Sequence, residues 1–293
     1  MAEEKKRTIA MSGATGFVGS HLTRAFAAQG WEVLPLDRRA FQLRPAELAA
    51  KLKNVAAVIN LAGAPVIARW SAEYKKNLRA SRIDVTRALV AAFALLDPKP
   101  AAFLSTSAVG IYAASATQVH TEENGQLAAD FLGHLCMDWE AAAKEAVALG
   151  IRTAILRLGI VFGRNGGALQ QMLPPFRLGL GGPIGNGTQP VSWIHIEDVA
   201  RVFLQAATDP TFEGIYNLTA PQPTDNNGLT KALGRALGRP TLLRIPPFIL
   251  WLRFGEGARI LTTGQTVLPK RLLDAGFNFA FADLEFAMRN CVA

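Results

Sequence analysis

The sequence predicts an α/β protein built on a doubly wound parallel sheet, with a smaller region on its C-terminal side. Short apolar strands alternate with helices of ten or more residues, which is the pattern of βαβ units with helices on both faces of a sheet. A glycine-rich turn follows the first strand, as in nucleotide-binding sheets. Half of the 293 residues are apolar, which is enough for a substantial core.

The expected elements follow from periodicity and from helix-ending residues. Strands are expected at 8–12, 31–36, 55–60, 101–105 and 152–156, and helices at 17–29, 72–96 and 131–149. Residues 163–187 are rich in Gly and Pro and predict a long loop. Helices are expected at 196–207 and 227–237, followed by a helical cap from about residue 245. We therefore predict a dinucleotide-binding domain at 8–160 and a substrate-side region at 161–293, with parts of the chain interleaved.

Composition argues against several classes of protein. No apolar run reaches the roughly 18 residues of a membrane-spanning helix, and the N-terminus lacks a signal-peptide pattern, so we expect a cytoplasmic protein without a membrane partner. Two cysteines and four scattered histidines predict no disulfide scaffold and no metal site. The net charge of +8 comes from dispersed arginines, so we expect no nucleic-acid partner.

The glycine turn predicts a dinucleotide site of the Rossmann type. Gly13, Gly16 and Gly19 have the spacing G-x-x-G-x-x-G between a strand and a helix. These glycines allow a tight turn, a close approach of the backbone to a pyrophosphate, and close packing of helix on strand. The helix N-terminus offers free N–H groups to the phosphates. The residues expected to contact the cofactor here are Gly13, Ala14, Thr15, Gly16, Phe17 and Val18.

The end of the second strand carries conflicting signals about the cofactor. Asp37 lies where a carboxylate hydrogen-bonds the adenine ribose, which favours NAD. Arg38 follows directly, and a guanidinium group suits the 2′-phosphate of NADP. These residues alone leave the choice between NADP and NAD open. Leu61, Ala62 and Gly63 follow the third strand and are expected to line the ligand crevice with small side chains.

These motifs together resemble the extended or atypical short-chain dehydrogenase/reductases of the nucleotide-sugar epimerase type. The segments that carry the resemblance are SGATGFVG at 12–19, NLAG at 60–63, STSAVGIY at 105–112, LRLG at 156–159 and WIHIEDV at 193–199. A narrower similarity at 172–185 and 268–277 is to the uncharacterised "epimerase family" proteins of that group. It covers nearly the whole chain.

The resemblance implies roles for individual residues. The subgroup carries a basic residue where Arg38 stands, which favours NADP over NAD. Arg82 occupies the place of an active-site asparagine and is expected to reach the cofactor's phosphates or nicotinamide ribose. Ser107 aligns with the serine that polarises the substrate oxygen, and Ser105 is the alternative.

The family's usual Tyr-x-x-x-Lys pair is not found in this sequence. None of the three tyrosines has a lysine four residues downstream, and the matching positions fall on Leu132 and Cys136. Both belong to an apolar stripe with helical spacing, so we expect Cys136 to be a buried, unreactive thiol. Tyr112 is the candidate for proton transfer if Arg82 lowers its pKa, with His120 and His134 as weaker candidates.

The sequence therefore predicts an NADP(H)-binding oxidoreductase or epimerase-like enzyme acting on a small molecule, for which a nucleotide sugar is one candidate. The alternative is a non-catalytic dinucleotide-binding sensor. His195 and Asp198 begin a helix that borders the substrate cleft in the resembling family, and structural roles are expected for both. The loop at 179–187 is a candidate lid. Oligomeric state is not predicted.

Overall fold

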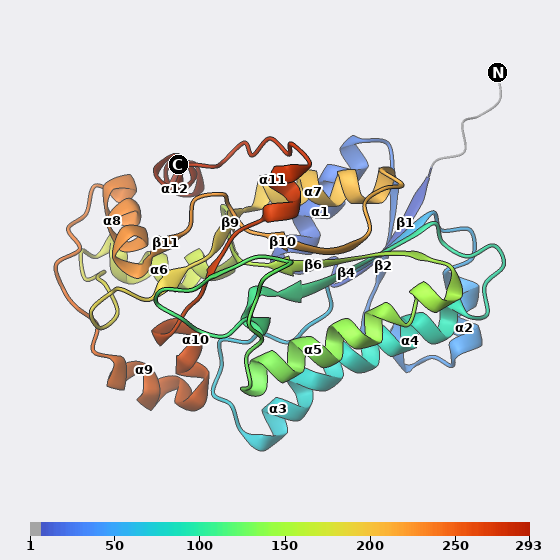
Figure 1. Cartoon of the computed structure of the whole chain (residues 1–293), viewed down its shortest axis with the longest axis horizontal. Coiled ribbons are helices and arrows are strands. Elements are labelled where there is room, and N and C mark those ends of the chain that lie inside the picture. Colours follow the sequence, from blue (N-terminus) through green and yellow to red (C-terminus); the bar gives the residue numbers. More distant parts are fainter. Residues whose placement is uncertain (1–6) are drawn as a thin grey trace.

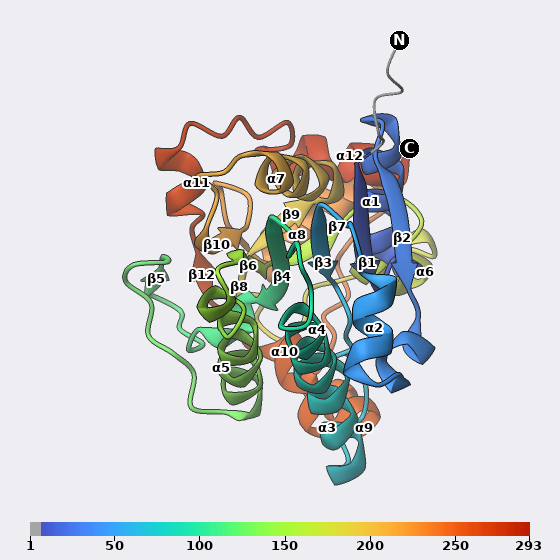
Figure 2. The ribbon, with the colours of Figure 1, turned by 90° about the vertical axis from the view of Figure 1, so that its right-hand side faces the viewer.

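A six-stranded parallel sheet forms the centre of the computed structural model, which describes residues 7–293. Its strands are β1 (Thr8–Ser12), β2 (Glu32–Leu36), β3 (Ala57–Asn60), β4 (Ala102–Ala108), β6 (Arg152–Leu158) and β10 (Gly214–Leu218). The sheet crosses the middle of Figure 1. Its strand order is β2-β1-β3-β4-β6-β10, which Figure 2 shows, and every neighbouring pair is parallel. The predicted doubly wound fold is confirmed. The direction of winding reverses between β1 and β3, the place where such sheets bind ligands.

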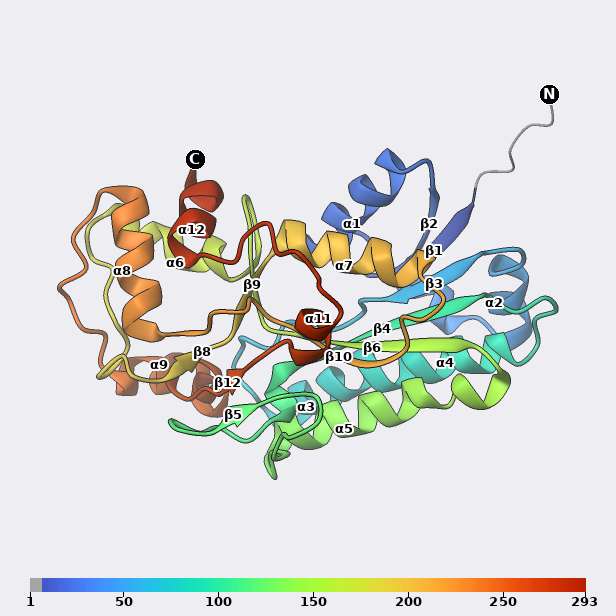
Figure 3. The ribbon, with the colours of Figure 1, turned by 45° about the horizontal axis from the view of Figure 1, so that its top comes forward.

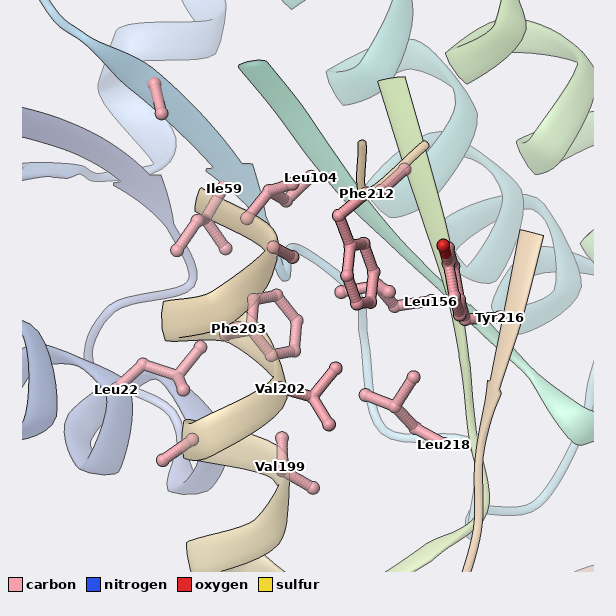
Figure 4. Close-up of a cluster of buried hydrophobic side chains, with 14 of the residues drawn as sticks. Leu22, Ile59, Leu104, Leu156, Val199, Val202, Phe203, Phe212, Tyr216 and Leu218 are labelled. Atoms are coloured by element: carbon pink, nitrogen blue, oxygen red, sulfur yellow. The ribbon is translucent and has the colours of Figure 1, made fainter. Parts of the chain in front are cut away.

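Helices cover both faces of this sheet (Figure 2). One face carries α1 (Phe17–Ala28) and α7 (Ile196–Thr208), and the other carries α2 (Pro45–Lys51), α4 (Val85–Phe93) and α5 (Phe131–Lys144). Figure 4 shows the first of these interfaces, where Leu22 and Phe203 of the helices face Ile59, Leu104 and Leu156 of the strands. Burial of strands on both faces explains their nearly continuous apolar sequences.

The remaining elements lie outside the six-stranded sheet. Helical elements are η1 (Arg38–Gln42), α3 (Ala72–Arg79), η2 (Ala80–Asp84), η3 (Val109–Ile111), η4 (Val147–Leu149), α6 (Gly167–Arg177), α8 (Asn226–Leu237), α9 (Pro247–Phe254), η5 (Gly255–Ala258), α10 (Arg259–Thr262), α11 (Lys270–Asp274) and α12 (Leu284–Val292). Short strands are β5 (Val119–His120), β7 (Ile160–Phe162), β8 (Pro190–Val191), β9 (Trp193–His195), β11 (Thr224–Asp225) and β12 (Thr266–Val267). Figure 3 shows α6, α8 and α12 grouped beyond one end of the sheet, around their own core.

Two expected elements differ from the structure. The single helix expected at 72–96 is interrupted by η2, a π-helical turn between α3 and α4. The loop expected at 163–187 contains the helix α6, with Pro174 and Pro175 inside it. Leu169 and Phe176 bury the apolar side of α6 against the core that contains α8, and this burial outweighs the two prolines.

The chain passes between the two regions more than once. Both α7 and β10 come after residue 160, yet they belong to the sheet and its covering layer. None of the helices within residues 7–293 combines the length and the apolar character needed to cross a membrane.

Candidate functional site

The β1–α1 turn needs glycine at two positions for steric reasons. Gly13 has φ +70°, and a Cβ there would lie 2.9 Å from the backbone oxygen of Leu61. A Cβ on Gly19 would lie 2.1 Å from the oxygen of Gly13. The turn therefore packs against the exit of β3 on one side and against the first turn of α1 on the other. This leaves a backbone cradle with no side chain inside it.

The N-terminus of α1 is free to bind an anion. Gly16 is its N-cap, no side chain caps it, and the first turn contains no acidic residue. Thr15 and Gly16 are exposed, so the uncapped end faces outward. The ring of Phe17 packs on Gly166 and Gly167, where an added Cβ would lie 2.3 and 2.8 Å from ring atoms. The loop that follows β7 thus borders the cradle.

At the end of β2 the aspartate and the arginine differ in their availability. One carboxylate oxygen of Asp37 accepts hydrogen bonds from the backbone N–H groups of Arg39 and Ala40, both at 3.1 Å, and so caps η1. Arg38 is exposed, and no carboxylate of residues 7–293 forms an ion pair with it. The carboxylate already has a structural partner, whereas the guanidinium is open to a phosphate.

A buried polar chain fixes the exit of β3. Ser12 Oγ donates to Asn60 Oδ1 at 2.7 Å and accepts from the backbone N–H groups of Leu61 and Ala62 at 3.1 and 3.2 Å. Asn60 Nδ2 donates to Thr86 Oγ1 of α4 at 2.8 Å. The crevice-lining residues predicted from the sequence are therefore held rigidly beside the glycine turn.

Arg82 lies at the same edge of the sheet. Its Nη2 donates to the carbonyl of Ala64 at 3.0 Å, and its guanidinium packs against Gly63, where a Cβ would be 2.9 Å away. The guanidinium also lies 5.3 Å from the ring centroid of Trp139. Burial lowers the pKa of Arg82 from its usual value, and no carboxylate in the described part of the chain pairs with it. This cation is positioned by carbonyls and an aromatic ring, and its charge remains uncompensated.

The two positions matched to the family's tyrosine and lysine belong to the packed face of α5. Leu132 packs with Leu135 and Trp139, and Cys136 is buried. Burial raises the pKa of Cys136 to about 12, so it is a core thiol, as expected. Arg82 and Cys136 are close enough for the positive charge to favour the thiolate, although burial dominates.

Ser107 and Tyr112 are joined by a buried charge cluster. Ser107 Oγ donates to Glu140 Oε1 at 2.8 Å. Arg157 binds both oxygens of Glu140, through Nε at 2.7 Å and Nη2 at 2.8 Å. Its Nη1 donates to the hydroxyl of Tyr112 at 2.7 Å, and that hydroxyl donates to Asn217 Oδ1 at 2.9 Å. We call these five residues the Glu140–Arg157 cluster.

The structure corrects the expected link between Arg82 and Tyr112. The guanidinium over the Tyr112 ring is that of Arg157, at 5.0 Å from the ring centroid. Burial raises the pKa of Tyr112, and Arg157 opposes that rise only in part. Tyr112 is 2% exposed, so this geometry favours a structural hydroxyl over an acid or base that exchanges protons with a substrate.

The histidines and Asp198 have structural contacts. His195 caps α7 through Nδ1 and stacks on Phe281 at 3.7 Å between ring centroids. The carboxylate of Asp198 accepts from the backbone N–H groups of Ala280 and Phe281, which ties the C-terminal segment to α7. His120 stacks on Tyr112, and His134 contacts the carbonyl of Asp130.

Sequence reasoning did not identify the ion pair of Glu140 and Arg157. Its signal was present, because Glu140 stands among the apolar residues of the helix at 131–144 and Arg157 lies in an apolar strand. A charge of each sign inside buried elements indicates a buried pair.

Two family descriptions match the chain. "NAD dependent epimerase/dehydratase family" matches residues 9–219, and "Domain of unknown function (DUF1731)" matches residues 245–291. Epimerase family protein YfhF of Bacillus subtilis is 36% identical over 97% of this chain and 98% of its own length. The chloroplastic SDR39U1 homologue of Arabidopsis thaliana is 36% identical over 98% of this chain and 87% of its own.

Solved structures agree with these similarities. The crystal structure of human epimerase family protein SDR39U1 with NADPH has a TM-score of 0.89 and 34% identity, covering 96% of this chain and 98% of that one. MoeE5 in complex with UDP-glucose and NAD has a TM-score of 0.79 at 20% identity, covering 97% of this chain and 96% of that one, and shares the fold.

Proposed function

Because the chain belongs to the NAD-dependent epimerase/dehydratase family, we propose that it binds NADPH at the β1–α1 turn and acts as an oxidoreductase or epimerase-like enzyme. The observation that carries the proposal is the backbone cradle formed by Gly13 and Gly19, with the uncapped N-terminus of α1 beside it. The human relative that was crystallised with NADPH supports this choice of cofactor.

The residues of the site fit a dinucleotide with a 2′-phosphate. Gly13 and Gly19 let the turn pack closely on the exit of β3 and on the start of α1, and the uncapped N-terminus of α1 offers N–H groups to a pyrophosphate. Arg38 is exposed and unpaired by any described carboxylate, so it can bind the 2′-phosphate, whereas Asp37 is engaged as a cap. NADPH therefore fits better than NADH, and NAD(H) remains the alternative cofactor.

Arg82 is proposed to supply the cation that a lysine supplies in the resembling family. Arg82 belongs to η2, whereas the position that matches the family's lysine is Cys136 of α5. The charge of Arg82 nevertheless acts on Cys136, because it favours the thiolate of that residue. The uncompensated guanidinium beside Gly63 can hold the ribose or phosphate oxygens at the crevice. NADPH, when bound, would supply the hydride, and the protein would hold the cofactor and the substrate in the orientation that the transfer requires.

Ser107 and Tyr112 are proposed to be positioning residues, which hold neighbouring parts of the site in place. Their hydroxyls join β4 and the segment after it to Glu140 and Arg157, and this fixes the floor of the crevice. General acid–base catalysis contributes typically about 10²–10⁴ in rate, so an enzyme without the usual tyrosine and lysine still gains from orientation. The substrate is proposed to be a small carbonyl or hydroxyl compound, with nucleotide sugars as one class.

The test has two readouts. Loss of NADPH absorbance is followed with a panel of carbonyl compounds, and formation of an epimer is followed by chromatography with nucleotide sugars and oxidised cofactor, because an epimerase consumes no net cofactor. We expect the wild-type protein to oxidise NADPH with one class of compound and Arg82→Gln to reduce that rate without unfolding the protein. Arg87→Gln, an exposed arginine one helical turn further on, is the matched control and keeps the wild-type rate. NADPH binding without turnover of any compound would overturn the enzymatic proposal in favour of a dinucleotide sensor.

A further inference from the structure

One end of the molecule exposes a concentrated apolar surface. Within residues 7–293, eight of the fourteen large apolar side chains that are strongly exposed lie in two short segments, 178–180 and 242–252. They are Leu178, Leu180, Leu242, Leu243, Phe248, Ile249, Trp251 and Leu252. Leu242 is 85% exposed and Leu252 77%. The helix α9 buries none of its residues in the protein (Figure 1, lower left).

The two segments are brought together by the backbone pairing of residues 182–185 with 243–245 and by the contact of Gly179 with Pro240, where an added Cβ would lie 3.8 Å from the proline ring. Gly185 N donates to Ile245 O and Ile245 N donates to Pro183 O, each at 2.9 Å. Gly182 lies so close to the carbonyl of Leu243 that no Cβ would fit between them. Arg69 Nη1 donates to the carbonyl of Leu252 at 3.4 Å, and Lys75 of α3 pairs with Glu256 of η5 at 2.6 Å. The C-terminal end of α9 is therefore fixed to α3 and to the segment before it. We call residues 177–180 and 239–253 together the α9 surface.

The charge of the α9 surface has a single sign. Its four charged residues are Arg177, Arg239, Arg244 and Arg253, all exposed, and it contains no aspartate or glutamate. The surface therefore carries four of the eight units of the chain's formal net charge. None of these four arginines forms an ion pair within residues 7–293.

We propose that the α9 surface docks onto an anionic phospholipid membrane. A concentration of exposed apolar side chains with arginines among them matches the requirements of interfacial binding, in which apolar side chains enter the headgroup boundary and arginines meet lipid phosphates. Trp251 and Phe248 are residue types suited to that boundary. A second copy of the chain fits less well, because a two-fold contact would place these arginines against their own equivalents.

The proposal differs from the sequence prediction of a protein without a membrane partner. That prediction rested on the lengths of apolar runs, which report on spanning helices. The segment at 242–252 is short, and only the structure shows that its apolar side chains stay uncovered and that the chain around 179–185 lies against residues 240–245. Peripheral docking requires no spanning helix.

Sedimentation with lipid vesicles tests the proposal on the full chain. We expect binding to vesicles of phosphatidylcholine mixed with phosphatidylglycerol, weaker binding to phosphatidylcholine alone, and release by added salt. Phe248→Ser and Leu252→Ser, one helical turn apart on α9, should each abolish most of the binding. Leu95→Ser, which is 58% exposed outside the α9 surface, is the matched control and leaves binding unchanged. Arg244→Gln should weaken binding about fivefold and Arg87→Gln should not.

Analytical ultracentrifugation tests the alternative that a second copy of the chain covers the α9 surface. A wild-type protein that binds no vesicle but forms a dimer that Phe248→Ser dissociates would overturn the proposal in favour of self-association. Equal vesicle binding by Leu252→Ser, Leu95→Ser and the wild type would also overturn it, because the apolar residues of α9 would then contribute nothing.

Discussion

The ion pair of Glu140 and Arg157 allows a quantitative test of the structure. Glu140→Leu removes the carboxylate and leaves a guanidinium whose side chain is 7% exposed without its counter-charge. Breaking a buried pair from one side costs about 3–5 kcal/mol. The variant also removes the acceptor of the Ser107 hydroxyl, which adds about 1 kcal/mol. We therefore expect the free energy of unfolding to fall by about 4–6 kcal/mol.

Urea unfolding measures this change, with the slope of the transition as a check that both proteins unfold in one step. The double variant Glu140→Leu with Arg157→Met should recover most of the loss, because a buried pair replaced by apolar side chains is often close to neutral. Glu145→Leu, an exposed glutamate on the same helical stretch, is the control and should change stability by no more than about 0.5 kcal/mol. The reasoning fails if Glu140→Leu costs less than about 1 kcal/mol, or if the double variant loses the sum of both single losses.

Three further predictions concern the turn, a histidine and the thiols. Gly19→Ala places a Cβ 2.1 Å from a backbone oxygen and should weaken dinucleotide binding about tenfold or more in a titration. The control Gly30→Ala meets no atom within 4 Å, but its φ of +78° strains any residue with a Cβ, so it should lower stability and leave binding intact. Burial lowers the pKa of His195 from 6.5 to about 4. Between pH 6.5 and pH 4 the imidazole is therefore protonated in the unfolded chain and neutral in the folded protein. The contribution of His195 to the free energy of unfolding should therefore be lost as the pH drops from 6.5 to 4 and should be constant above pH 6.5. His195→Asn keeps an acceptor at the cap of α7, so urea unfolding of this variant should depend less on pH over that range. Burial raises the pKa of Cys136 and Cys291 to about 12, so a thiol reagent should label neither cysteine until urea unfolds the protein. Labelling of the folded protein would contradict the burial of these two thiols.

The sheet and the glycine turn could be predicted from sequence because both depend on local patterns. Apolar strands, helix periodicity and the spacing of Gly13, Gly16 and Gly19 are visible in short windows of the chain. The π-helical turn η2 could not be predicted, since it differs from an α-helix only in backbone pairing. The helix α6 was missed because its two prolines are local signals, whereas the burial of Leu169 and Phe176 depends on distant α8 and α12.

In the candidate site too, the contacts between distant segments could not be predicted from the sequence. The end of β2 presented Asp37 and Arg38 as competing cofactor ligands, and only the structure shows that the aspartate caps η1. The family resemblance selected Ser107, which lies near the C-terminal end of β4, but it could not show that Glu140 accepts its hydrogen bond. Pairings between α5 and β6 depend on tertiary packing, which no single segment encodes.

The uncapped N-terminus of α1 and the exposed Arg38 are proposed to make this chain an NADPH-binding protein. Calorimetric titration of the wild-type protein and of Arg38→Ala with NADPH and NADH, after any carried-over cofactor has been removed, tests it most directly. We expect the wild-type protein to prefer NADPH and Arg38→Ala to lose that preference while binding of NADH stays unchanged. A wild-type protein that binds neither dinucleotide, or an NADPH preference that survives in Arg38→Ala, would contradict the account.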